Sequence, residues 1–258
     1  MRSLGNTALN LNAQPETFLT YHAILPESSP YSYDVSVRKF REHVRLCAEW
    51  PGLQKHGMTF PRFTFDDGHI SQFLHALPAL EEHSVKGIFF ITTGWTGKRA
   101  NYMDWPELRR LVDMGHEVHS HGYSHALLTH CSEKDLQREL LESKNALEDS
   151  LGTEVDSISM PGGRWNGYVV AACVNAGYKR IFTSDPWHKR SQRIQLLGRF
   201  NIEQDVTPAD LQELLRPQSS RRAKYVMRHH AKTLIRSLVG DHAYHWLWAQ
   251  LTGWREEK

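Results

Sequence analysis

Seven short apolar runs alternate with longer amphipathic stretches along most of the chain, and this alternation constrains the fold more than any other feature. The runs cover 18–22, 60–65, 85–91, 116–120, 154–160, 178–183 and 194–200. Such alternation is typical of βα units, in which helices return successive strands to one parallel sheet. The sequence therefore predicts an α/β protein with a parallel sheet or barrel.

Helix boundaries between these runs are marked by residues that favour helix ends. Ser36, Asp104 and Ser132 each precede a stretch with helical periodicity, and a further helix is predicted over 166–177. Their side-chain oxygens can accept hydrogen bonds from the unpaired amides of a first helical turn. The longest helix is expected to end at Gly152. Its expected inward residues are Leu136, Leu140, Leu141 and Leu147.

Composition bounds the domain organisation and the partners. A chain of 258 residues can bury one large core, so one barrel domain is predicted over 1–206, with a helical extension over 207–258 packed on it. The net charge of +2 gives no argument for a nucleic-acid partner. Three cysteines without a Cys-x-x-Cys indicate neither a disulfide framework nor a thiolate metal site. No window reaches membrane-spanning length and the start lacks the apolar core of a signal peptide, which predicts a cytoplasmic protein.

Two adjacent carboxylates follow the second apolar run. In Phe-Pro-Arg-Phe-Thr-Phe-Asp-Asp-Gly, residues 60–68, Asp66 and Asp67 lie where a strand would end, and Gly68 lets the chain turn sharply. Alone, Asp-Asp-Gly is most often an ordinary turn. At a strand end, however, one carboxylate can bind a cation while the other handles a proton.

A pair of histidines follows the fourth run. His121 and His125 are four residues apart, and two imidazoles at that spacing can converge on one ion. An unaccompanied pair is more often packed or exposed histidine. Together with a carboxylate, these histidines predict a metal site with positions open for water and substrate. His119 shares a strand face with His121 and is a rival ligand.

These residues resemble the NodB-type polysaccharide deacetylases, carbohydrate esterase family four. The resemblance rests on Thr-Phe-Asp-Asp-Gly followed by Gly-His-Glu-Val-His-Ser-His-Gly-Tyr-Ser-His. It implies an irregular (β/α) barrel of about seven strands. It also implies that Asp66 is the general base and that a divalent metal, usually zinc, is held by Asp67, His121 and His125. His119 is then expected around the ligands rather than among them.

The block Ser-Met-Pro-Gly-Gly-Arg-Trp-Asn, residues 159–166, follows the fifth run. A plain strand-to-helix connection would explain it equally well. In the resemblance it forms a groove wall from Pro161, Gly162, Gly163 and Arg164. Arg164 stands after the glycines, not before the proline as in the family's common form, and is expected to orient Asp66. A backbone N–H near Gly162 is expected to help to hold an oxyanion.

The general acid is missing from the family's usual late position. No Leu-x-His is evident after residue 190, whereas Phe-Leu-Thr-Tyr-His-Ala-Ile occurs at 18–24. The early Tyr-His resembles the poly-N-acetylglucosamine deacetylase branch and makes His22 the candidate acid, the alternative being a packed histidine at a strand end. Asp185 is expected either to orient a catalytic histidine or to bind sugar beside Trp187.

The chain changes character after Thr207-Pro208, where a helix start is predicted. Residues 221–236 include six Lys or Arg, and Tyr244, Trp246, Trp248 and Trp254 follow. Two interpretations stay open. One is an outer helix that buries its apolar stripe on the barrel. The other is a peripheral contact with an anionic membrane surface, which would suit a lipid-linked sugar.

The combined prediction is a metal-dependent hydrolase that removes N-acetyl groups from an amino sugar in a glycan or a sugar-lipid precursor. Hydrolysis of another amide or of an ester passes through a similar oxyanion, so the scaffold does not exclude it. A non-catalytic carbohydrate-binding protein is the other alternative. The retained pair Asp66 and Asp67 argues against it, because a binding protein needs no base beside a metal ligand.

Overall fold

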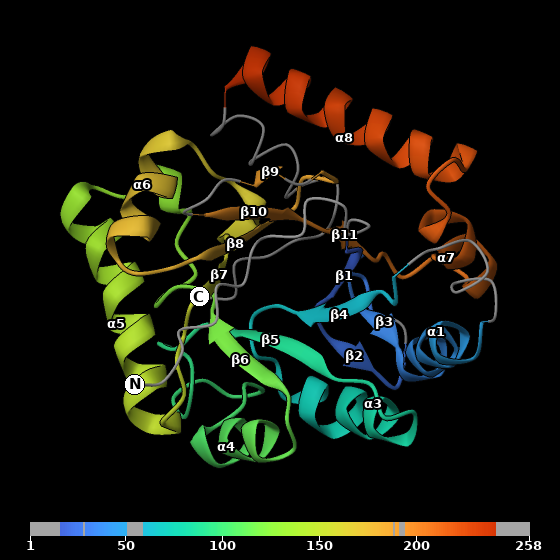
Figure 1. Cartoon of the computed structure of the whole chain (residues 1–258), viewed down its shortest axis with the longest axis horizontal. Helices are drawn as coiled ribbons and strands as arrows, with labels where there is room; N and C mark the ends of the chain where they lie inside the picture. The colour runs from blue at the N-terminus through green and yellow to red at the C-terminus, as the bar shows by residue number, and fades with distance from the viewer. Residues whose placement is uncertain (1–15, 28, 51–58, 188, 191–193, 241–258) are drawn as a thin grey trace, which may run out of the picture.

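A curled sheet surrounded by helices makes up the computed structural model, which describes residues 16–27, 29–50, 59–187, 189–190 and 194–240 (Figure 1). The sheet has nine strands in the order β11-β1-β4-β5-β6-β7-β8-β10-β9. The parallel strands are β1 (Phe18–Tyr21), β4 (Arg62–Phe65), β5 (Gly87–Ile91), β6 (Glu117–Ser120), β7 (Ser157–Ser159), β8 (Arg180–Thr183), β10 (Gln195–Gly198) and β11 (Phe200–Asn201). The antiparallel edge strand is β9 (Lys189–Arg190), and β2 (Ile24–Leu25) pairs with β3 (Val35–Ser36) in a separate small sheet.

Helices cover the outer face of this sheet. They are α1 (Val37–Glu49), α3 (Leu77–Glu82), α4 (Trp105–Asp113), α5 (Glu133–Leu151), α6 (Gly167–Asn175), α7 (Pro208–Leu215) and α8 (Ser220–Val239). Shorter turns of helix are η1 (Gln72–Ala76), η2 (Leu128–His130) and η3 (Pro161–Gly163). The alternation of strands with helices confirms the α/β prediction.

The seventh predicted strand divides in two, and this division closes the barrel. β10 pairs with β8, whereas β11 pairs with β1 on the other side of the sheet, and only Arg199 separates the two strands. Eight strands therefore run parallel, where the resemblance implied about seven. A single chain segment changes partners at Arg199, because strand twist carries it from one edge of the curled sheet to the other.

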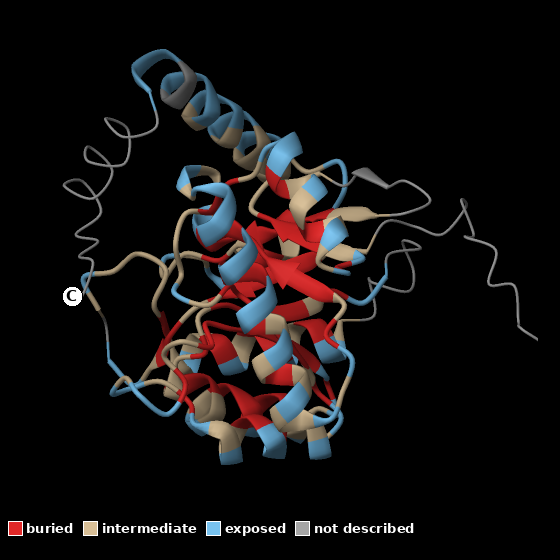
Figure 2. Ribbon diagram, turned by 90° about the vertical axis from the view of Figure 1, so that its left-hand side faces the viewer, coloured by how far each residue is buried: buried red, intermediate tan, exposed pale blue. Residues whose placement is uncertain are grey.

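Side chains that alternate along the strands fill two separate spaces. Inside the barrel lies a small apolar cluster, formed by Phe18, Ile88, Phe90, Phe182 and Leu197. A larger cluster packs the opposite faces of the strands against the helices. Figure 2 shows the consequence: buried residues gather in the sheet, and exposed residues lie along the outer helix faces.

The predicted helix starts are confirmed by their capping contacts. Ser36 accepts a hydrogen bond from the Lys39 amide, Asp104 and Glu107 form a reciprocal capping box, and Ser132 accepts from the Asp135 amide. The 166–177 prediction corresponds to α6, which is capped by its preceding asparagine. One inward assignment on α5 is wrong. Leu141 is 43% exposed, because the helix buries only a narrow stripe.

The extension over 207–258 is described as far as residue 240. Thr207 caps α7, which buries Leu211, Leu214 and Leu215. α8 follows and runs along the edge of the molecule (Figure 1). Tyr244, Trp246, Trp248 and Trp254 lie outside the described residues. Within the described residues, no helix combines the length and the apolar character needed to cross a membrane.

Candidate metal centre and catalytic cleft

A cleft of about 1160 Å³ lies at the carboxyl ends of the parallel strands. Such strand ends position the catalytic groups of barrel enzymes, because loops of independent sequence meet there. The cleft gathers residues from loops far apart in the chain, together with the inner face of α8. Its chemically active lining includes His22, Asp66, Asp67, His121, His125, Arg164, Asp185 and His229.

Asp67, His121 and His125 converge as the sequence predicts. Asp67 Oδ1 lies 3.2 Å from His121 Nε2 and 3.3 Å from His125 Nε2. One donor atom from each residue falls within 4.8 Å of the others, which forms a candidate metal triad. Carboxylate and imidazole donors in this number suit a divalent ion that keeps a position open for water.

Two observations show that these residues fit a metal ion. Asp67 Oδ1 is buried, yet within the described residues it accepts no hydrogen bond of normal geometry. His121 Nδ1 lies 3.0 Å from the Ser159 carbonyl oxygen, to which it can donate a proton, so that Nε2 presents its lone pair to the centre. Metal-binding histidines are commonly held in this manner. Burial by itself raises the pKa of Asp67, but the facing imidazoles bring it well below its usual value.

The backbone around the triad adopts an unusual conformation. Asp67 and His125 have φ angles of 75° and 66°, in the left-handed region that residues with a side chain rarely occupy. Gly68, with φ of 85°, continues the turn as the sequence predicts. Strain of this kind persists where the surrounding structure imposes it, and it is often found at functional sites.

Asp66 is held on the other side by Arg199 and Ser159. The Arg199 guanidinium donates to both carboxylate oxygens, at 2.7 and 2.8 Å, across a separation of 133 residues. The Ser159 hydroxyl donates to the same carboxylate at 3.0 Å and accepts from Arg199 at 2.7 Å. Arg199 thus supplies a guanidinium on Asp66 that the sequence analysis did not identify. Arg164 lines the cleft, and its expected role in orienting Asp66 stays a prediction.

This pairing decides the charge of Asp66. Burial raises the pKa of its carboxyl group, but the Arg199 charge and the neighbouring imidazoles outweigh burial and lower the pKa below the ordinary value. Asp66 is therefore a carboxylate at neutral pH. Arg199 was missed because it lies inside the apolar run 194–200, which was predicted to form one strand. Its charge was the only feature that distinguished it within that run.

His22 reaches the cleft from the end of β1. Its ring stacks obliquely on Tyr33, with centroids 5.4 Å apart, and its Nδ1 is buried without a hydrogen-bond partner among the described residues. It contributes electrostatically to both Asp66 and Asp67, so it lies near the two carboxylates. This placement is compatible with the predicted acid and leaves the role itself a prediction.

A second imidazole enters the cleft from α8. His229 Nε2 lies 3.0 Å from Asp185 Oδ1, and the Trp165 indole donates to the other oxygen of Asp185 at 2.9 Å. Asp185 thus pairs with a histidine, and the two roles expected for it stay predictions. His229 was missed because it lies in a basic helix where its spacing gives no catalytic signal.

The glycine-rich block is only partly at the cleft. Gly162 and Gly163 line it, whereas Pro161 and Trp187 are not among its described lining residues. Trp187 instead stacks on His230 of α8, with centroids 4.9 Å apart. A Cβ atom on Gly163 would lie 2.2 Å from the Ser184 hydroxyl, so glycine is required there by close packing.

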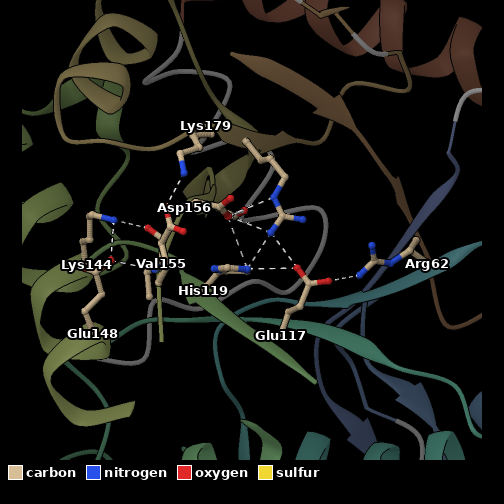
Figure 3. A network of polar contacts seen from close by, with 11 residues as sticks. Arg62, Glu117, His119, Lys144, Glu148, Val155, Asp156 and Lys179 are labelled. Atoms are coloured by element: carbon tan, nitrogen blue, oxygen red, sulfur yellow. Dashed lines mark hydrogen bonds and ion pairs between the residues drawn. The ribbon is translucent and has the colours of Figure 1, made fainter. Parts of the chain in front are cut away.

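His119 does not approach the triad. Its Nε2 lies 3.3 Å from a Glu117 carboxylate oxygen and 3.0 Å from an Arg180 nitrogen, toward the amino ends of the strands (Figure 3). Strand alternation does place it on the interior face with His121, as predicted. It is not part of the candidate triad, because its Nε2 contacts Glu117 and Arg180, two positions before His121 along the chain.

Comparisons with known proteins agree with this geometry. The structure is an α/β barrel with a candidate metal triad and, beside it, a separate buried carboxylate at the carboxyl end of the strands. Residues 61–181 match the family model described as polysaccharide deacetylase. This part of the chain is therefore similar to the polysaccharide deacetylase family.

Individual relatives cover parts of the chain. A chitooligosaccharide deacetylase of Sinorhizobium fredii is 35% identical over 127 residues, which cover 48% of this chain and 56% of the relative, so the chain spans about half the length of that protein. The Streptococcus pyogenes deacetylase PplD, solved with acetate, superposes with a TM-score of 0.71 at 20% identity, covering 80% of this chain and 100% of that one. IcaB from Ammonifex degensii gives 0.62 at 19% identity, covering 78% and 95%. At these identities the two structures establish the fold.

Proposed function

We propose that the protein is a metal-dependent hydrolase that removes N-acetyl groups from an amino sugar within a glycan. The observation that carries this proposal is the division between two adjacent carboxylates. Asp67 faces two imidazoles, whereas Asp66 is held by Arg199. A binding protein has no use for this second, separately oriented carboxylate. The sequence relative named as a chitooligosaccharide deacetylase supports the same substrate class.

Asp67, His121 and His125 would hold the ion, for which we propose zinc. A bound divalent ion supplies Lewis acidity toward an acetamide carbonyl and lowers the pKa of water. Asp66 accepts the proton of the attacking water. Because Arg199 keeps Asp66 ionised, the base is always available, although a low pKa makes it a weak one. The bidentate contact also fixes which carboxylate edge faces the cleft.

The departing amine needs a proton, and His22 is our proposed donor. It lies near both carboxylates and lines the same cleft. His229 is the competing candidate, because it lines the same cleft and Asp185 orients its ring. A backbone N–H near Gly162 remains the proposed additional donor to the oxyanion.

The cleft walls suit a sugar ring. Tyr31, Tyr33, Trp95 and Tyr102 all line it, and aromatic faces offer apolar contact to the flat side of a pyranose. Arg164 and Asp185 supply hydrogen-bonding groups to the same lining. We include a sugar-lipid precursor among the proposed substrates, with peripheral membrane contact through the basic C-terminal region. Another amide or an ester is the alternative on the same scaffold.

The test is acetate release from N-acetylglucosamine oligomers by the zinc-loaded protein. We expect release by the parent and by Asp205→Asn, an exposed control carboxylate, and a loss of about 100-fold or more in Asp66→Asn. Equal release by Asp66→Asn would remove Asp66 as the base. No release by a parent shown to bind zinc would contradict the proposed substrate and direct the assay to other amides and esters.

A further inference from the structure

α8 exposes an unusual amount of apolar surface. Of the large hydrophobic side chains that are exposed in the described residues, five lie on this helix: Met227, Leu234, Ile235, Leu238 and Val239. Met227 is 70% exposed and Leu238 is 77% exposed. Scattered exposed hydrophobic residues are normal, but a continuous apolar stripe marks an interaction surface.

Three of these exposed residues form one stripe with Ala231 because of their spacing. Met227, Ala231, Leu234 and Leu238 are separated by four, three and four residues, which places them on one face of a helix. Tyr225, His229 and Lys232 occupy the opposite face with the same kind of spacing. Tyr225 packs on Phe200 and accepts from the Asn201 amide, and His229 pairs with Asp185. The barrel thus fixes which face of α8 points outward, and Figure 2 shows the helix at the edge of the molecule with exposed residues along it.

The charge of α8 has one sign. The helix contains six Lys or Arg residues and no Asp or Glu. Lys224 and Arg228 are exposed beside the apolar stripe. Arg228 pairs at 3.2 Å with Glu203 from the barrel. Lys224 has no acidic partner within the described part of the chain. An outward apolar stripe with basic side chains along its border matches the composition of helices that lie in the interface of anionic bilayers.

We infer that α8 docks the protein on an anionic lipid surface through the stripe Met227, Ala231, Leu234 and Leu238. Of the two interpretations that the sequence left open for the basic region, this inference adopts the contact with an anionic membrane surface. Nucleic acid would satisfy the basic residues but not the leucines. The inner face of the same helix lines the cleft through His229 and Lys232. A docked protein would therefore hold its cleft beside the lipid headgroups, where a membrane-attached glycan is presented.

Sedimentation of the full chain with vesicles tests the inference. We expect the parent to sediment with vesicles of equal parts phosphatidylglycerol and phosphatidylcholine, and far less with phosphatidylcholine alone. Leu234→Gln combined with Leu238→Gln should weaken binding by about ten-fold or more, since both leucine side chains of the parent would move from water into the bilayer interface on binding. Lys224→Gln should weaken it about five-fold, the scale for one basic residue at an anionic surface. The matched controls are Leu141→Gln and Lys134→Gln, exposed on α5, which should bind as the parent does.

Three results would overturn the inference. The first is a parent that sediments with neither kind of vesicle, and the second is a double leucine variant that binds as well as the parent. The third is a dimer in solution that the same double variant disperses, because a second copy would then cover the stripe. Acetate release from soluble oligomers should be unchanged in all these variants, since none of the altered residues lines the cleft. Failure of docking is thus separate from failure of the proposed reaction.

Discussion

Charged side chains line both ends of the barrel, but they are arranged differently at each. At the amino end, Glu117 pairs with Arg62 and, at 2.8 Å, with Arg180, which also contacts Asp156 at 3.0 Å (Figure 3). At the carboxyl end, the two imidazoles face Asp67 without satisfying its buried oxygen.

The difference shows what each end is built to do. At the amino end, each carboxylate is paired with a cationic side chain, so a bound ligand would gain little electrostatic free energy there. A buried carboxylate oxygen without a hydrogen bond costs free energy, which a bound cation would recover. Asp66 lies at the carboxyl end, but it is paired with an arginine, as the carboxylates of the amino end are. Such a pair suits a base, which must stay oriented and ionised without binding the ion. Substitutions at the two ends should therefore separate activity from stability.

The largest effects are expected from the adjacent carboxylates. Asp67→Asn, His121→Ala and His125→Ala should lose zinc and activity together, because each removes one of three ligands. Asp66→Asn should lose activity while keeping zinc. Metal content by elemental analysis of purified, zinc-loaded variants checks both statements. Zinc retained at parental levels in all three ligand variants would contradict the triad.

Arg199→Met should destabilise the protein by about 3–5 kcal/mol, because it leaves the buried Asp66 carboxylate without its cation. Activity should fall as well, since the orientation of the base is lost. Urea unfolding measures the free energy of unfolding. Arg216→Met, at an exposed pair with Glu213, is the matched control and should change it by at most about 1 kcal/mol. Equal stability of the two variants would show that the Arg199 pair is not a structural element.

The acid should be distinguishable by substituting each imidazole. We expect His22→Ala to lower kcat by about 100-fold and to remove the alkaline limb of the pH–rate profile. His229→Ala should lower kcat less and keep that limb, and the exposed His130→Ala should behave as the parent. The reverse result for His22 and His229 would transfer the role to the pair of His229 and Asp185.

The smallest effect is expected at the amino end. Burial raises the pKa of Glu117, but contacts with His119, Arg180 and Arg62 outweigh it and lower the pKa well below 4.5. The stabilisation is thus present at neutral pH and is lost as the pH falls from 4.5 toward the lower folded-state pKa. Glu117→Gln should cost about 1 kcal/mol at pH 7, since a third of the side chain is exposed, and the difference should shrink in acid. Acetate release should remain parental. A loss of activity without a loss of stability would contradict the division between the two ends.

Much of the fold follows from local patterns in the sequence. Capping by Ser36, Asp104 and Ser132 depends on contacts within one helical turn, so it could be predicted from neighbouring residues. The strands were equally recognisable, because apolar runs of this length bounded by turns have few other uses. Asp66 and Asp67 could be predicted as site residues because they follow a predicted strand, where carboxylates can reach a cation or a substrate. Without that strand, Asp-Asp-Gly is an ordinary turn sequence.

The partners of these residues could not be predicted in the same way. The Arg199 contact with Asp66 depends on the position at which the seventh run stops pairing with β8 and begins to pair with β1. No local pattern encodes that change of partner. His229 reaches Asp185 only because α8 lies across the cleft. The outward direction of the Leu234 and Leu238 stripe is likewise decided by the opposite face, which the barrel holds.

Sequence alone thus determined the elements and the chemical groups at their ends. The charge and the spacing of side chains within one helical turn or one strand are local properties of the sequence. The helices and strands that they favour are stabilised by hydrogen bonds between nearby residues. The tertiary structure alone decided which distant charge orients the base, how many strands close the barrel and which face of α8 meets solvent. These depend on the long-range packing of a parallel barrel, where contacts join residues more than a hundred positions apart.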